Sequence, residues 1–368
     1  MSFQDIKGQN KPIQILKSYI EQNHLKGGYL FIGPEAVGKK SVAKTLAKAV
    51  NCQAINLDTS TALCFDKLSI RPERAKRVEG LSVNGERSRT IDSCDRCISC
   101  IKIEKNQHPD VHIIDATTLS SIDIEQNRSD AGGSDAIKIG HIRQLQKDIS
   151  LKPYEGKKKV FIIDDAHNLT QAASGALLKI LEEPPQDSLI ILISNKPILL
   201  FKTIISRCKV LKFYSLARPE LENIFKKDFA LNDNTAHFLA YFSEGRLGCA
   251  LRLKDTDILK EKNRIIDQIV FSRKANINNL LIQNREDLRA YLNILATWFR
   301  DIYLLKVGIA HSEIINFDRR DDLLKVMSRF SFLDLDQILN SISDSILYLG
   351  QNINIKLLLS NLKYSMEG

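Results

Sequence analysis

Continuous apolar runs alternate with helix-like segments over the first two thirds of the chain. Three short runs are apolar at almost every position, and each is followed by glycine, aspartate or asparagine: Gly28–Ile32, Lys159–Ile163 and Ser188–Ser194. By contrast, Ser41–Val50 repeats its apolar residues at helical spacing. Apolar strands that alternate with helices are typical of a parallel sheet covered by helices on both faces. The pattern therefore predicts an α/β fold for this part of the chain.

The last third of the chain, from about residue 259, has a helical pattern and few glycines. Leu281–Arg300 and Asp336–Leu349 carry apolar residues at intervals of three to four positions, which predicts amphipathic helices. Trp298 and Tyr303 fall in the most regular stretch, together with several leucines. We expect these side chains to form core and subunit contacts rather than a ligand pocket, so this third is predicted to be all-helical.

Length and composition limit the class of protein. At about 150 residues per domain, 368 residues predict two or three domains. The net charge of +9 suits a phosphate-rich partner such as nucleic acid, although the excess is spread diffusely along the chain. No apolar run approaches the roughly 18 residues of a membrane span, and the N-terminus lacks the pattern of a secretory signal. The odd count of 7 cysteines argues for a reducing compartment, so a cytoplasmic protein without a membrane partner is expected.

Three of the cysteines form a tight repeat, in which two residues separate Cys94 from Cys97 and Cys97 from Cys100. This spacing lets three thiolates converge on one ion and fits tetrahedral zinc, with Zn–S distances of about 2.3 Å. An iron–sulfur cluster is the lesser alternative, because no proline follows the last cysteine and no second cluster motif is present. The fourth ligand is open between Cys52, which follows the predicted helix, and Cys64, which lies in an irregular stretch.

A glycine-containing loop joins the first predicted strand to the first predicted helix. It runs from Gly33 through Gly38 and Lys39 to Ser41. This is the context of a phosphate-binding P-loop, in which backbone N–H groups and the helix N-terminus face the phosphates and the lysine reaches the outer ones. The match fails at Lys40, where the motif has the Ser or Thr whose hydroxyl holds Mg²⁺. Ser41 is one position too late to replace it, so the site is predicted to cradle phosphate but to be impaired in metal-assisted hydrolysis.

Acidic and polar residues follow the other two predicted strands. Asp164 and Asp165 come directly after Lys159–Ile163, as in a Walker B element. Asp164 would face the metal, and Asp165 would stand where a glutamate usually activates water. Because aspartate is one methylene shorter than glutamate, its reach to that water is in question, and it can equally cap the next helix. Asn195 follows the third strand and is a candidate phosphate sensor.

Several local strings are similar to those of one family. Ala173–Pro185 resembles the NALLK-LEEPP helix of bacterial clamp-loader subunits, and Ser206-Arg207-Cys208 resembles their SRC motif. Cys94–Cys100 is similar to their zinc module, and Phe3–Gln9 to their N-terminal box. The chain thus resembles the AAA+ clamp-loader subunits of DNA polymerase III.

This resemblance implies an α/β AAA+ P-loop domain with an inserted zinc module, a small helical lid domain and an all-α C-terminal collar domain. The expected limits are residues 1–213, 214–256 and 257–368, with the zinc module at about 52–100.

One segment departs from the family pattern. In the family the first zinc cysteine lies shortly before the other three, whereas here residues 53–93 form a long basic insertion. Because loops lengthen at a small entropic cost, the metal site can survive this insertion. By its position at the helix end Cys52 is expected to be the fourth zinc ligand, with Cys64 as the alternative. We expect the insertion to be a solvated excursion rather than a nucleic-acid contact, and residues 120–134 to be another loop.

Three positions separate two branches of the family. The gamma/tau motor subunits carry GKT, an Asp-Glu Walker B and a sensor-2 arginine, where this chain has Lys40, Asp165 and Gly248. His108–His112 and Gln351–Leu359 also look like strings of the delta prime subunits. The resemblance therefore favours the delta prime branch, with little or no ATPase activity of its own and ATP binding left open. A gamma/tau-like motor is the alternative.

The resemblance also implies partners and a role for one arginine. The partners are the gamma/tau and delta subunits of a hetero-oligomeric ring, which acts on the sliding clamp and on primed DNA. Arg207 would act in trans as an arginine finger at the ATP site of a neighbouring subunit. A planar, permanently charged guanidinium matches phosphate oxygens in a way that lysine does not.

Overall fold

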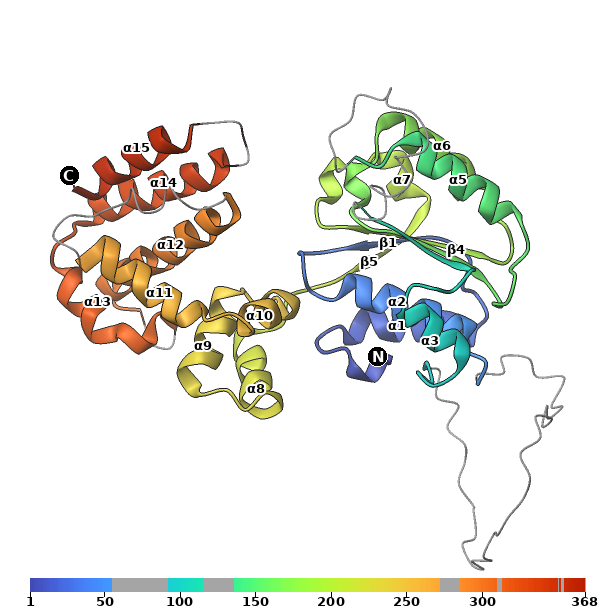
Figure 1. Cartoon of the computed structure of the whole chain (residues 1–368), viewed down its shortest axis with the longest axis horizontal. Coiled ribbons are helices and arrows are strands. Elements are labelled where there is room, and N and C mark those ends of the chain that lie inside the picture. Colours follow the sequence, from blue (N-terminus) through green and yellow to red (C-terminus); the bar gives the residue numbers. More distant parts are fainter. Residues whose placement is uncertain are drawn as a thin grey trace, which may run out of the picture. The chain divides into compact units, whose positions relative to one another are not determined.

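The computed structural model describes residues 1–54, 92–115, 136–271, 285–309, 313–349, 351 and 354–367. The chain divides into two compact units, Met1–Tyr214 and Ser215–Gly368 (Figure 1). Cys64, most of the basic insertion and the loop predicted at residues 120–134 lie outside the described residues. The predicted limits of a separate lid and collar stay predictions.

A five-stranded sheet forms the centre of the first unit (Figure 1). Its strands are β1 (Gly27–Ile32), β2 (Val111–Ile114), β3 (Lys159–Ile163), β4 (Ser188–Ser194) and β5 (Cys208–Lys212). They lie in the order β2-β3-β4-β1-β5, and every pairing is parallel. The predicted parallel sheet is therefore confirmed, and all carboxyl ends of its strands meet at one edge.

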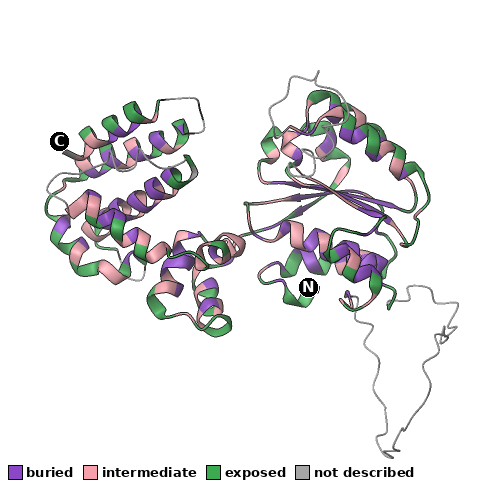
Figure 2. Ribbon diagram, viewed as in Figure 1, coloured by how far each residue is buried: buried purple, intermediate pink, exposed green. Residues whose placement is uncertain are grey.

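Helices cover both faces of this sheet. The helices on one face are α1 (Asn10–Glu21), α2 (Lys39–Asn51) and α3 (Ile98–Glu104), and those on the other are α5 (Ile139–Ser150), α6 (Gln171–Glu182) and α7 (Lys202–Ser206) (Figure 1). Because successive side chains of a strand point to opposite faces, β4 contributes Ile191 to the core beside α2 and Ile190 to the core beside α6. The central strands are buried on both sides (Figure 2), which explains why they are apolar at almost every position.

The second unit is helical in the ranges that the structure describes. Its helices are α8 (Arg218–Asp228), α9 (Asp233–Phe242), α10 (Leu247–Lys254), α11 (Ile258–Ile266), α12 (Arg285–Val307), α13 (Arg320–Met327), α14 (Phe332–Tyr348) and α15 (Ile355–Glu367). Trp298 of α12 is fully buried in a cluster formed by α11 to α15, and Tyr303 packs partly buried against the same cluster. The predicted helical character is confirmed, as is the core position of Trp298, whereas the expected subunit contacts stay a prediction.

Short helical turns complete the fold. They are the 3-10 helices Phe3–Asp5, Ala166–Asn168, Pro197–Leu199 and Phe317–Arg319 and the π-helical turn Asp267–Phe271. Within the described ranges, no helix combines the length and the apolar character that crossing a membrane would need.

Candidate nucleotide site and cysteine cluster

The loop between β1 and α2 needs glycine at both of its ends. Gly33 has φ of 150°, and a Cβ on it would lie 2.3 Å from the carbonyl oxygen of Phe213. Gly38 has φ of 98° and is the N-cap of α2. Any other residue would be strained at these positions, because L side chains rarely adopt such φ angles. The loop therefore turns tightly from the strand into the helix N-terminus, as a phosphate-binding loop does.

Lys39, the expected phosphate-binding lysine, is 6% exposed and folds back on its own loop. Its Nζ donates to the carbonyl oxygen of Gly33 at 2.7 Å and to that of Pro34. Burial lowers the pKa of Lys39, although the charges of Asp164 and Asp165 oppose the shift. In this structure, the loop carbonyls thus take the hydrogen bonds that a phosphate would otherwise receive.

Two carboxylates and an ammonium group meet at the carboxyl edge of the sheet. Asp115 follows β2 and Asp164 follows β3, and Lys40 of α2 lies between them. The Nζ of Lys40 is 2.8 Å from Oδ2 of Asp115 and 3.2 Å from Oδ2 of Asp164. Burial alone lowers the pKa of Lys40, but the hydrogen bond to Asp115 and the charge of Asp164 outweigh it, so the pKa is raised. Lys40 therefore stays protonated at neutral pH.

Asp115 is a site residue that the sequence reasoning missed. The signal was present, since the residue directly follows Val111–Ile114, a short run that forms β2. Ile114 pairs with Ile163, so the next residues of the two strands are neighbours.

The other polar groups at the carboxyl edge of the sheet, Asp165 and Asn195, make weaker contacts than Asp115 and Asp164. Asp165 has the left-handed φ of 47°, and its Oδ1 is 3.9 Å from Nδ1 of His167. Burial and the charge of Asp164 raise the pKa of Asp165, and burial lowers that of His167. The Oδ1 atom of Asn195, after β4, is buried without a hydrogen-bond partner among the described residues. Ser41 lies in the first turn of α2, one residue beyond Lys40.

Arg207 lies at the opposite edge of the sheet from the P-loop. It caps the C-terminal end of α7 and directly precedes β5, whose first residue, Cys208, pairs with Gly28 at the start of β1. Lys39 follows the end of β1, and the two strands are parallel. The five paired residues between these edges span about 16 Å. Arg207 is therefore remote from the P-loop of its own chain.

The Arg207 side chain is 37% exposed and held by neighbouring groups. Its Nη1 donates to the carbonyl oxygen of Thr203 at 3.1 Å, and its Nη2 lies 2.8 Å from Oε1 of Glu182 at the end of α6. Burial raises the pKa of the adjacent Cys208 thiol to about 12, so this cysteine, which packs partly buried against the core, stays neutral.

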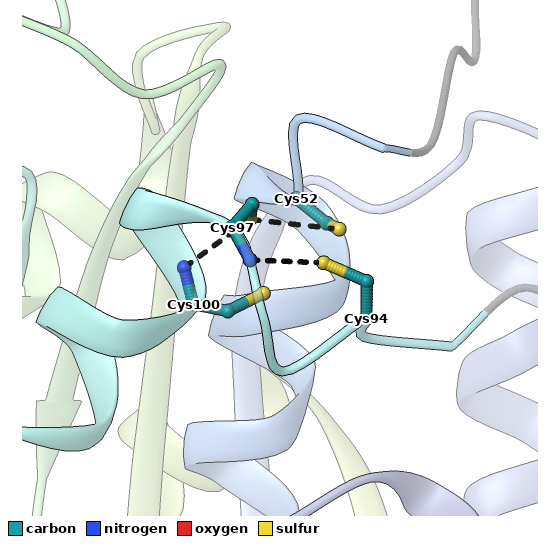
Figure 3. Close-up of side chains that lie close together, drawn as sticks. All are labelled: Cys52, Cys94, Cys97 and Cys100. Atoms are coloured by element: carbon teal, nitrogen blue, oxygen red, sulfur yellow. Dashed lines mark hydrogen bonds between the residues drawn. The ribbon is translucent and has the colours of Figure 1, made fainter. Parts of the chain in front are cut away.

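Four cysteines converge beside the first unit's α2 (Figure 3). Cys52 is the C-cap of α2, Cys97 is the N-cap of α3, Cys100 lies in the first turn of α3, and Cys94 lies three residues before Cys97. Their sulfur atoms point toward a common space and lie within 4.8 Å of one another (Figure 3). The Sγ atoms of Cys52 and Cys97 are 4.0 Å apart.

This arrangement fits a metal ion. Four sulfur ligands around one point form the tetrahedral set that zinc prefers, in which neighbouring sulfurs are about 3.8 Å apart. The backbone N–H of Cys97 donates to Sγ of Cys94 at 3.3 Å. Although burial opposes it, such backbone hydrogen bonding lowers the pKa of Cys94 to about 7, whereas burial raises that of Cys52. Together, the four cysteines are able to hold one metal ion.

The parallel sheet and the glycine-containing loop between β1 and α2 give the chain the fold of the P-loop class, and comparisons with known proteins define its family. Residues 8–86 and 75–217 match the family model described as DNA polymerase III, delta subunit, and residues 257–367 match the model described as its C terminal part. The chain belongs to this AAA+ family of DNA polymerase III clamp-loader subunits.

Individual relatives include both types of subunit that the sequence suggested. The tau subunit of Bacillus subtilis is 25% identical over 354 residues, covering 89% of this chain and 54% of the relative. The delta' subunit of the same organism is 25% identical over 310 residues, covering 82% of this chain and 78% of the relative. The tau subunit of Escherichia coli is 28% identical over 285 residues, covering 76% of this chain and 36% of the relative. This chain thus spans only about half, or less, of the tau relatives.

Among solved structures, a gamma subunit-related protein of DNA polymerase III from Thermotoga maritima aligns over 97% of this chain and 99% of its own. The TM-score is 0.45 and the sequence identity is 17%.

Proposed function

We propose that the chain is a delta prime-like subunit of the DNA polymerase III clamp loader, which helps to place the sliding clamp on primed DNA during replication. In this proposal it joins gamma/tau and delta subunits in a hetero-oligomeric ring, and it hydrolyses little or no ATP itself. The family and the delta' and tau relatives support a clamp-loader role. The choice of the delta prime branch depends on the residues of the site.

The position of Arg207 carries this proposal. It is an exposed guanidinium at the sheet edge opposite the P-loop, about 16 Å along the strands from the end of β1. A group at that edge does not reach phosphates held by its own loop, but it is available to a neighbouring subunit. An arginine that stabilises charge on a γ-phosphate in trans increases the rate by roughly 10³–10⁵ in well-studied nucleotide hydrolases. Arg207 would thus serve the ATP site of an adjacent motor subunit.

The residues at the chain's own site support the absence of hydrolysis. Lys40 replaces the hydroxyl that holds Mg²⁺, and Asp165 replaces the glutamate that activates water. Gly248, in α10 of the second unit, stands where the motor subunits have their sensor-2 arginine. Three altered positions in one chain favour a subunit that contributes to the ring without turnover at its own site.

The cysteine cluster and the helices have supporting roles in this proposal. Zinc held by Cys52, Cys94, Cys97 and Cys100 would tie the end of α2 to the start of α3. The helical lid at residues 214–256 would link the P-loop domain to a collar at residues 257–368, through which the subunits associate. The collar's α14 and α15 expose apolar side chains such as Leu347 and Leu357, as an association surface does.

The purified full-length chain tests the choice of branch. Its ATP turnover with Mg²⁺ is expected to be negligible, while adding it to gamma/tau and delta subunits restores loading of the clamp on primed DNA. Sustained turnover by the chain alone would favour the gamma/tau alternative. As a control, the mixture of gamma/tau and delta subunits must load the clamp when the delta prime subunit from the same source as those subunits is added. Failure of this chain to restore loading in that mixture would overturn the proposal.

A further inference from the structure

Two adjacent strands end in carboxylates at the place where the fold family holds a divalent metal. Asp164 N donates to the carbonyl oxygen of Ile114 at 2.9 Å, so that Asp164 and Asp115 lie next to each other. Their side chains are only 20% and 23% exposed. Two neighbouring carboxylates in a partly buried place repel each other unless a cation lies between them. In P-loop nucleotide hydrolases this cation is Mg²⁺, held by the loop hydroxyl and a Walker B aspartate.

The residues of this chain do not fit Mg²⁺. Lys40 occupies the position of the metal-binding Ser or Thr. The ammonium group of Lys40 already contacts the carboxylates of Asp115 and Asp164, at 2.8 Å and 3.2 Å. The contact with Asp115 has the length of a charge-assisted hydrogen bond and the contact with Asp164 is an ion pair, and together they leave no room for an ion between the same oxygens.

The two neighbouring lysines of the loop behave differently. Lys39 is buried against loop carbonyls and its pKa is lowered, whereas Lys40 is bound to acids and its pKa is raised. Asp115 and Asp164 therefore bind the ammonium group of Lys40, whereas that of the adjacent Lys39 binds loop carbonyls.

We propose that Lys40 is a built-in cation that replaces the divalent metal of the P-loop site. Its ammonium group neutralises Asp115 and Asp164 and excludes Mg²⁺ from the carboxyl edge of the sheet. The chain has thus lost the Ser or Thr hydroxyl that binds the metal, but the ammonium group of Lys40 supplies a positive charge in its place. This charge stabilises the two carboxylates without a metal. This inference concerns metal binding alone, and it holds whichever branch of the family the chain belongs to.

Manganese, whose free aqueous ion gives an electron paramagnetic resonance signal, tests this proposal with the full chain. Wild type is expected to leave the signal unchanged, whereas Lys40→Ser uncovers the carboxylates and restores a hydroxyl. We expect Lys40→Ser to bind Mn²⁺ at least about tenfold more tightly than wild type, since removing one charge about 4 Å from a partly exposed site changes affinity by that order. The double variant Lys40→Ser/Asp164→Asn should lose the gain, and Lys40→Arg, which keeps the cation, should behave like wild type.

A stability measurement keeps the proposal testable if Lys40→Ser folds poorly. Lys40→Met leaves the carboxylates without a cation, so its thermal midpoint should lie below that of wild type in magnesium-free buffer and recover with millimolar Mg²⁺, since a ligand of the folded state stabilises it. The midpoint of wild type should not respond to Mg²⁺. The proposal is overturned if wild type binds Mn²⁺ in a manner that Asp164→Asn abolishes, or if neither Lys40 variant gains a response to metal.

Discussion

The guanidinium of Arg207 is paired with the carboxylate of Glu182, with Nη2 2.8 Å from Oε1. The two residues come from different motifs, since Glu182 closes α6 and Arg207 caps α7. Both side chains are substantially exposed, at 51% and 37%, and an exposed pair of this kind adds only about 0–1 kcal/mol to stability. The pair therefore has more effect on where the guanidinium points than on how stable the subunit is.

Replacing Arg207 tests its action in trans. In a reconstituted clamp loader, Arg207→Ala is expected to reduce DNA-dependent ATP turnover at the neighbouring site by roughly 10³–10⁵-fold, because that site loses a charge-stabilising group. Thermal unfolding of the isolated variant should be nearly unchanged, since the side chain is partly exposed. Arg207→Lys keeps the charge but not the planar fork, so it should recover only part of the rate. If the complex with Arg207→Ala hydrolysed ATP at the wild-type rate, Arg207 would not act as an arginine finger.

A second variant tests whether Glu182 acts only by positioning the guanidinium of Arg207. Glu182→Gln removes the ion pair but leaves Arg207 in place, so its turnover should fall by less than that of Arg207→Ala. The double variant should match Arg207→Ala alone, because a residue that acts only by positioning Arg207 has no effect once the arginine is gone. A further loss in the double variant would mean that Glu182 acts independently.

The sheet was more predictable from the sequence than the site. β1, β3 and β4 are continuously apolar because helices cover both of their faces. The edge strands β2 and β5 were not predicted, since β2 has 4 residues and β5 exposes both of its lysines.

Contacts between distant residues explain what the sequence could not show. The sequence identified Lys40 as an unusual residue, but its pairing with Asp115 depends on the register of β2 against β3. Similarly, the spacing of Cys94, Cys97 and Cys100 indicated a metal site, whereas the approach of Cys52 depends on how α2 packs against α3.

Cysteine variants test the metal site. The wild-type chain is expected to contain zinc in stoichiometric amount, and Cys97→Ser or Cys52→Ser should lose it and lower the thermal midpoint, because three thiolates hold the ion less well. Metal analysis of the purified chains measures this. Cys249→Ser is the matched control, since Cys249 lies in α10 of the other unit.

Cys64→Ser settles the question that the sequence left open. It should retain zinc if Cys52 is the fourth ligand. Loss of zinc in Cys64→Ser but not in Cys52→Ser would assign the fourth position to Cys64 instead.

Asp110 is expected to make the first unit sensitive to acid. It is fully buried, and its carboxylate accepts backbone N–H groups from Tyr154, Glu155 and Gly156 at 2.7, 2.8 and 2.7 Å. Burial by itself raises the pKa of Asp110, but these hydrogen bonds outweigh it, so the pKa is lowered. A lowered pKa in the folded state stabilises the fold above the unfolded pKa of about 3.9, and the contribution is lost as the pH falls through the folded pKa.

Asp110→Asn measures this contribution. It should lower the free energy of unfolding at pH 7 by about 1.5–3 kcal/mol, the value of hydrogen bonds to a charged group. The difference from wild type, followed by urea unfolding, should shrink as the pH falls below about 4. Asp187→Asn, at an exposed position, is the control and should change little. A difference that does not depend on pH would mean that the charge of Asp110 is not what matters.

The second unit contains a buried ion pair whose two partners are not equivalent. Lys262 of α11 is fully buried, and its Nζ lies 2.6 Å from Oδ1 and 2.7 Å from Oδ2 of Asp318, which is 15% exposed. Nζ also lies 4.9 Å from the ring centroid of Phe238, so the pair links α11 to α9 and to the 3-10 helix at Phe317–Arg319. Burial lowers the pKa of Lys262, and the charge of Asp318 opposes this shift.

Asp318→Asn should therefore destabilise the chain strongly, by about 3–5 kcal/mol, because it leaves a buried ammonium group without its counter-charge. Adding Lys262→Met should recover much of the loss, since an unbranched apolar side chain of similar length then fills the same place. Urea unfolding of the two single variants and the double variant gives the coupling free energy directly. If the double variant were as unstable as the sum of the single ones, the two residues would be contributing independently, and the ion pair would not be what holds these helices together.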